Sequence, residues 1–202
     1  MQNHFALNLF RGSAITFVKN TKELETMKDL IRLRTSLKEE MEIALNAQCK
    51  MEAEASQKYL AMASWLDRNG FLKSAGYLYK QAEEEREHFL KIFRYINEVG
   101  GVAITPTIGE VQQEFISLKS VFEVALQSEI AVTNAINKIV AKCREINDYT
   151  TENFLMWFVT EQREEESNAR RALELFDLID SESPTGKFVL DKEIAKIGTP
   201  EV

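Results

Sequence analysis

The sequence predicts an all-α protein: a four-helix bundle with one long crossover between the second and third helices, plus a short fifth C-terminal helix. Four long stretches carry apolar residues at helical spacing, and only eight Gly and three Pro occur in 202 residues. The breaks between the stretches are short, long and short in that order, which constrains how the helices connect.

The predicted helices begin and end at recognisable signals. Ser36 with Glu39, and Ser120 with Glu123, each match a capping box at a helix start. Asn69-Gly70 supplies a stop signal, and residues 183–186 are interpreted as a break before the last helix. The predicted helical ranges are 36–67, 71–99, 120–147, 151–180 and 188–197.

The connections predict the topology. Because only a residue or two joins the first helix to the second, and the third to the fourth, each pair must be antiparallel. Residues 100–117 separate the pairs. A helix of this length is roughly 40 Å long, and an extended segment of this size reaches roughly 55–60 Å. This segment is therefore expected to cross the length of the bundle.

Composition narrows the function classes. The formal net charge of −7 gives no electrostatic reason to expect nucleic acid or an anionic membrane as a partner. No apolar run approaches the ~20 residues that a transmembrane helix needs. Cys49 and Cys143 lie far apart without a C-x-x-C pair, so we expect two buried thiols in a reducing compartment, the cytoplasm.

Residues 1–35 are predicted to form an N-terminal extension, flexible and separate from a domain over 36–202. Residues 1–26 are interpreted either as such an extension or as a misassigned start upstream of Met27. They lack a basic amino-terminal region and a clear cleavage site, so no signal peptide is predicted. His4, within them, is expected to be exposed.

Each long helix carries a glutamate in the middle of an otherwise apolar stripe. His88 follows one of them by three residues, and Gln162 precedes another by three. Unpaired buried carboxylates cost several kcal/mol each, and the stripes hold no Lys or Arg at that level. A divalent metal is the simplest compensation. The four glutamates are Glu52, Glu85, Glu129 and Glu165.

The ligand types indicate which metal. Several carboxylates with one imidazole suit Fe(II), Fe(III) or Mn(II), whereas zinc prefers more nitrogen or sulfur. Di-iron bundles carry two Glu-x-x-His motifs; here Glu85-x-x-His88 is one, and Gln162-x-x-Glu165 stands where the second would be. A single buried glutamate is as often a paired structural residue, but four at one level beside His88 favour a metal site.

From residue 38 to 197 the chain resembles the bacterial non-haem ferritins. The resemblance rests on motifs at residues 50–52, 59–65, 83–88, 154–166 and 188–193. It implies the ferritin-like topology and a ferroxidase centre. Glu52, Glu85 and His88 would bind a first iron, and Glu85 would bridge to a second iron held by Glu129 and Glu165, with Gln162 beside the pair.

The resemblance implies three further assignments. Glu84, Glu161 and Glu164 match the ligands of a third iron site, although glutamates beside the stripe are most often a solvated face. Tyr59 matches a tyrosine that helps to reduce oxygen, and Trp157 a neighbouring aromatic; both also fit as core aromatics. Arg163 stands where the family often has histidine, at a position that is not a ligand.

The expected function is oxidation of Fe(II) with O₂ or H₂O₂ and storage of Fe(III) as mineral in a hollow homo-oligomer, by resemblance a 24-subunit shell. No haem is expected, because a bacterioferritin needs a second Glu-x-x-His. A rubrerythrin needs four cysteines at one iron, and a mini-ferritin binds iron between subunits. The alternative is a non-enzymatic helical scaffold or interaction protein without a functional metal site.

Overall fold

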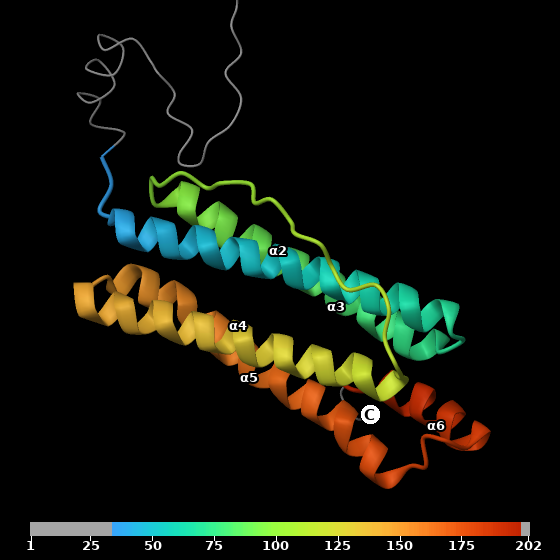
Figure 1. Cartoon of the computed structure of the whole chain (residues 1–202). Coiled ribbons are helices and arrows are strands. Elements are labelled where there is room, and N and C mark those ends of the chain that lie inside the picture. Colours follow the sequence, from blue (N-terminus) through green and yellow to red (C-terminus); the bar gives the residue numbers. More distant parts are fainter. Residues whose placement is uncertain (1–33, 199–202) are drawn as a thin grey trace, which may run out of the picture. The chain divides into compact units, whose positions relative to one another are not determined.

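The computed structural model describes residues 34–198, and all regular structure within that range is helical. The predicted N-terminal extension therefore lies almost entirely outside the described residues, as does His4. The all-α prediction is confirmed, with four long helices and a short C-terminal one (Figure 1). The helices are α2 (Glu39–Arg68), α3 (Leu72–Glu98), α4 (Leu118–Ile146), α5 (Tyr149–Leu178) and α6 (Pro184–Ile194).

The long helices form two antiparallel hairpins, α2–α3 and α4–α5 (Figure 1). Gly70 turns the chain between α2 and α3 with φ of +84°, a conformation that glycine adopts without steric cost. Asn147 ends α4 in the left-handed region at φ +59°, and Asp148 then caps α5. Both turns are short, as predicted, so neighbouring helices in the chain are neighbours in space.

The crossover between α3 and α4 follows α2 along its length (Figure 1). Near one end of α2, the Asn46 side chain donates to the Val102 carbonyl at 3.0 Å and accepts from the Ile104 amide at 2.8 Å. At the other end, Arg68 donates to Glu114 at 3.2 Å. Asn46 and Arg68 are separated by roughly 33 Å of helix, so the crossover covers that distance as the sequence predicted.

The predicted capping box of Ser36 and Glu39 is wrong. The helix begins at Glu39, and its N-cap, Lys38, makes no side-chain capping hydrogen bond. Instead the Thr35 hydroxyl donates to the Val99 carbonyl at 2.5 Å, and Leu37 is buried against the core. The chain before α2 is thus fixed by tertiary contacts with the end of α3, which outweigh the local capping signal.

The predicted capping box of Ser120 and Glu123 is also displaced. Ser117 is the N-cap of α4: its hydroxyl accepts from the Ser120 amide at 3.1 Å, and the Ser120 hydroxyl accepts from the Ser117 amide at 2.9 Å. Serine can thus replace glutamate at the third helical position. The start of α5 is likewise two residues earlier than predicted. The Asp148 carboxylate caps this helix by accepting a hydrogen bond from the Thr151 amide at 3.0 Å.

Within residues 34–198, the interior holds two apolar clusters with the buried glutamates between them. On α2, one cluster holds Met41 to Cys49 and the other begins at Tyr59. The same division separates the apolar residues of α3, α4 and α5. The thiols of Cys49 and Cys143 are buried as predicted, and burial raises the pKa of Cys49 to about 12. Among residues 34–198, no helix is both long and apolar enough to cross a membrane.

Residues 183–186 begin α6 rather than breaking the chain before it, so the prediction of a helix over 188–197 was wrong at its start. The Ser183 hydroxyl accepts from the Gly186 amide at 3.0 Å, and Pro184 occupies the first turn, where its missing N–H costs nothing. The helix end is also earlier than predicted, at Ile194.

Substituting Gly186 with alanine is expected to destabilise the protein by roughly 2–4 kcal/mol. A Cβ at this position would lie 1.7 Å from the Asp180 carbonyl oxygen, so α6 would have to move from its place on the bundle. Chemical denaturation of both proteins measures the loss. Gly76→Ala is the matched control, since its Cβ would meet nothing within 4 Å in α3, and it should be neutral or stabilising. Equal stability of the two variants would contradict the packing assigned to Gly186.

Candidate metal centre

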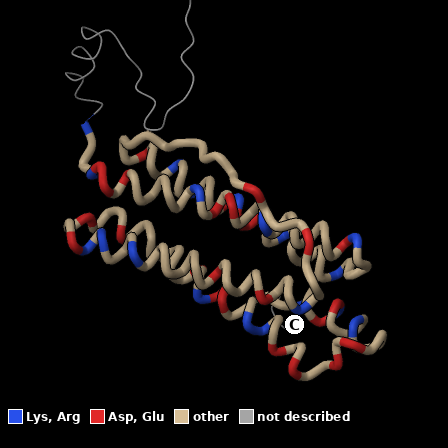
Figure 2. Tube along the Cα trace, viewed as in Figure 1, with Lys and Arg blue, Asp and Glu red and all other residues tan. Residues whose placement is uncertain are grey.

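Four buried glutamates, one from each long helix, lie at the boundary between the two apolar clusters. The exposed fractions of Glu52, Glu85, Glu129 and Glu165 are 0%, 1%, 1% and 6%. Each helix buries its glutamate because the residue shares a face with apolar neighbours at helical spacing. The four glutamates gather at this one boundary, whereas the other acidic and basic residues are distributed along the helices (Figure 2).

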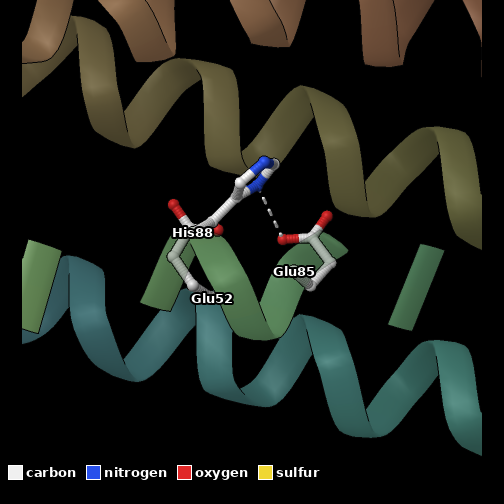
Figure 3. Close-up of side chains that lie close together, drawn as sticks. All are labelled: Glu52, Glu85 and His88. Atoms are coloured by element: carbon white, nitrogen blue, oxygen red, sulfur yellow. Dashed lines mark ion pairs between the residues drawn. The ribbon is translucent and has the colours of Figure 1, made fainter. Parts of the chain in front are cut away.

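The closest grouping joins α2 to α3. Glu52, Glu85 and His88 each offer one ligand atom, and these atoms lie within 4.8 Å of one another (Figure 3). The Nδ1 atom of His88 lies 3.5 Å from Glu85 Oε2. Glu52 Oε2, Glu85 Oε2 and His88 Nδ1 are buried, and none has a hydrogen-bond partner. Buried polar atoms without partners are rare and costly, so this cluster fits a cation that would satisfy all three.

Aromatic side chains fix the orientation of the imidazole. The His88 ring meets Trp157 edge-on with centroids 5.4 Å apart, and Phe158 at 5.9 Å. Trp157 is 40% exposed, and the Lys91 ammonium lies 4.0 Å from its ring centroid. His88 is therefore held between the protein interior and a partly exposed indole, with its ring directed at the two carboxylates.

Neutral donors bind the other two glutamates. The Tyr59 hydroxyl donates to Glu129, and the Gln162 amide donates to the other Glu129 oxygen at 3.1 Å. Glu165 accepts from Gln81 at a longer 3.5 Å. The structure therefore brings Glu52, Glu85 and His88 into one group, and holds Glu129 and Glu165 in adjacent contacts with uncharged side chains.

Electrostatics links the four carboxyl groups. Burial raises the pKa of Glu52, and the charge of Glu85 raises it further. Burial also raises the pKa of Glu85, with Glu129 as the next cause. The pKa of Glu165 rises to about 8 through burial and then through Glu129. Because each carboxylate disfavours ionisation of another, the ionised cluster requires positive charge.

Two buried glutamines at the site were not predicted from the sequence. The Gln48 amide donates to Glu52 at 2.9 Å, leaving its own Oε1 without a partner. Gln81 reaches Glu84 and Glu165. Each glutamine precedes a stripe glutamate, Glu52 or Glu85, by four residues, and this repeated spacing was the signal that could have found them.

The predicted outer glutamates lie in a different setting. Glu84, Glu161 and Glu164 line a small cavity of about 60 Å³ together with Glu165 and Tyr77. Glu164 is exposed, whereas Glu84 and Glu161 are half-buried. Nearby carboxylates also raise the pKa of Tyr77, after burial as the first cause. The structure thus places these three residues next to the buried cluster, on its α3–α5 side.

The ligand atoms of the cluster, carboxylate oxygens and one imidazole nitrogen, determine which metal ions it can bind. Such a set binds iron or manganese and favours the higher oxidation state, because anionic oxygen attracts Fe(III) more strongly than Fe(II). The partners of Glu129, the Tyr59 hydroxyl and the Gln162 amide, are uncharged. A metal ion that displaces them therefore leaves no unpaired buried charge on either. The arrangement therefore suits binding of a divalent metal ion that then gives up an electron.

Comparison with known proteins agrees with this description. Residues 42–179 match the family described as "Ferritin-like domain". The chain is 37% identical over 155 residues to a probable bacterial non-heme ferritin-like protein of Haemophilus influenzae, covering 77% of this chain and 93% of that protein. It is 34% identical over 161 residues to a bacterial non-heme ferritin of Campylobacter jejuni, covering 80% and 96%.

A solved structure gives the same result. An open-pore ferritin from the archaeon Archaeoglobus fulgidus superimposes with a TM-score of 0.76 at 34% identity, covering 79% of this chain and 98% of that one. Both the bundle and its length are therefore shared with proteins of known structure. On the family match, the sequence identity and the fold together, this chain belongs to the ferritin family.

Proposed function

We propose that this protein stores iron and oxidises it on entry, converting Fe(II) to Fe(III) at a pair of adjacent positions inside the bundle. The observation that carries the proposal is the grouping of Glu52, Glu85 and His88. Their ligand atoms lie within 4.8 Å of one another, and each residue has a buried side-chain atom without a hydrogen-bond partner. The function of the named bacterial relatives as ferritins supports it.

Each buried carboxylate has an assigned role. Glu52, Glu85 and His88 bind the first Fe(II), while Glu129 and Glu165 bind the second, with Glu85 shared between them and Gln162 adjacent. Burial raises the pKa of Glu52 and Glu85, so Fe(II), which binds the ionised carboxylates, competes with protons for them. Ionised, the same groups favour Fe(III) and so assist electron loss.

Tyr59 lies beside the second position through its hydrogen bond to Glu129. Two Fe(II) ions supply two electrons, and reduction of O₂ to H₂O₂ consumes two electrons and two protons. The two Fe(II) ions therefore supply both electrons, and a buried phenol at hydrogen-bond distance from a ligand can deliver one of the two protons and regain it from the medium. Tyr59 is therefore assigned to oxygen reduction.

Storage requires a compartment for the product. We assign the chain to a cytoplasmic homo-oligomer, a hollow shell of 24 subunits, built from a ferritin-like domain over residues 36–202, with residues 1–35 as an extension to it. Glu84, Glu161 and Glu164 form an outer iron position beside the buried pair. No haem belongs to this proposal, because the chain has a single Glu-x-x-His motif.

Fe(II)-dependent oxygen uptake tests the activity. Adding Fe(II) to the metal-free protein in air should consume oxygen within seconds and raise the near-ultraviolet absorbance, and size-exclusion chromatography should show a large assembly. A small oligomer that still consumes oxygen would count against storage alone. A protein that consumes no oxygen above buffer, and whose thermal stability ignores both Fe(II) and chelator, would instead be the non-enzymatic scaffold.

A further inference from the structure

Both carboxylate oxygens of Glu84 are already engaged by residues of its own helix. The Lys80 ammonium lies 3.2 Å from Oε1, and the Gln81 amide donates to Oε2 at 2.5 Å. Lys80 and Gln81 precede Glu84 by four and three residues, so all three share one side of α3. A cation next to Glu84 must therefore compete with two donors.

The outer cavity contains these same residues. Its lining brings Lys80, Gln81 and Glu84 from α3 together with Glu161 and Glu164 from α5. Lys80 is the one cationic residue among those described around this cavity. An ammonium in such a small acidic space neutralises part of its charge and repels a metal ion.

We propose that Lys80 and Gln81 are positioning residues that hold Glu84 in its metal-free arrangement and so keep the outer iron position weak. The inference rests on the proposed function and adds the control of its outer position. The Lys80 side chain of this ion pair is 70% exposed, and exposed pairs of this spacing contribute little energy, so an arriving divalent ion can displace it. Iron then passes through this position instead of remaining there.

Gln81 connects the outer position to the buried one. Its amide nitrogen reaches Glu84 at 2.5 Å and Glu165 at 3.5 Å. When Glu84 turns to a metal ion, that amide becomes free to donate to Glu165 alone. The same side chain therefore responds to occupancy of the cavity and contacts a carboxylate of the buried pair.

Substitution of Lys80 tests the inference. Crystals of wild type, Lys80→Gln and Lys80→Gln/Gln81→Leu are soaked anaerobically in sub-saturating Fe(II), and anomalous scattering gives the occupancy of the outer position relative to the buried one. Because both positions lie in the same crystal, the ratio cancels differences in diffraction scale between crystals soaked at one Fe(II) concentration. We expect Lys80→Gln to raise the ratio roughly 3- to 10-fold, and the double variant to raise it at least as far.

Lys73→Gln is the matched control. It removes an equal charge from the same side of α3, two turns earlier and roughly 10 Å away along the axis, and its ratio should stay near that of wild type. An unchanged ratio in both Lys80 variants, or an equal rise in Lys73→Gln, would overturn the inference. Iron at the buried pair with an empty cavity in every variant would overturn it too, leaving the proposed function intact. Absence of iron from both positions would refute the proposed function itself.

Discussion

Replacing Glu85 with glutamine is expected to lower the initial rate of Fe(II)-dependent oxygen uptake by at least about 100-fold. Glutamine keeps the shape of the side chain but removes the charge that both iron positions share in the proposed centre. Glu85 interacts with both halves of the cluster: its ligand atom groups with Glu52 and His88, and the charge of Glu129 raises its pKa. An oxygen electrode, with Fe(II) added stoichiometrically to the metal-free protein, measures the rate.

Glu83→Gln provides the comparison for that experiment. Glu83 is exposed and lies two residues earlier on α3, on the opposite side from the buried stripe. The control removes the same charge from the same helix, so it should oxidise iron at the wild-type rate. Equal rates in wild type and Glu85→Gln would show that the oxidation takes place elsewhere, for example at exposed carboxylates.

The metal-free protein is expected to lose stability as the pH rises from about 5 to above 8. Burial and neighbouring carboxylates raise the pKa of Glu165 in the folded protein to about 8, from an ordinary value of 4.5. The folded state therefore binds a proton that the unfolded state has lost. The stabilisation is complete below the unfolded pKa and disappears as the pH passes through the folded one.

The size of this effect is large for a single group. Ionisation of Glu165 alone lowers the free energy of unfolding by on the order of 4 kcal/mol between pH 4.5 and 8. This loss corresponds to a fall in Tm of roughly 10 °C. Thermal unfolding of the chelator-treated protein across this range measures it. Glu165→Gln should flatten the profile, whereas Glu164→Gln, at an exposed neighbour, should not. Anaerobic Fe(II) should restore stability at pH 8, because the ion replaces the lost proton.

The topology could be predicted because its signals are strong and local. Stripes of apolar residues at helical spacing define the long helices, and the lengths of their connections decide which helices pair. The helix starts were harder. At Ser36 the capping signal was present, yet burial of Leu37 and the Thr35 hydrogen bond hold residues 36–38 outside the helix. A sequence does not show which of two favourable local arrangements the tertiary contacts select.

The buried carboxylates could be placed at one level from sequence because each interrupts its stripe near the middle of its helix. Their hydrogen-bond partners could not. The four-residue spacing of Gln48 and Gln81 from Glu52 and Glu85 marks them as candidates, but it does not show that Gln81 reaches Glu165 on another helix. The same holds for Tyr59, whose contact with Glu129 joins α2 to α4 across 70 positions of sequence. Such contacts depend on rotamers and helix packing, which periodicity does not determine.

The division of the chain into two hairpins also divides the site. Glu52, Glu85 and His88 belong to α2–α3, whereas Glu129 and Glu165 belong to α4–α5. Each hairpin alone holds two of the four carboxylates, so it meets only part of the electrostatic repulsion. Repulsion reaches its full strength only when the two halves dock. Docking of the two hairpins is therefore the step that most needs protons or metal ions to offset the repulsion.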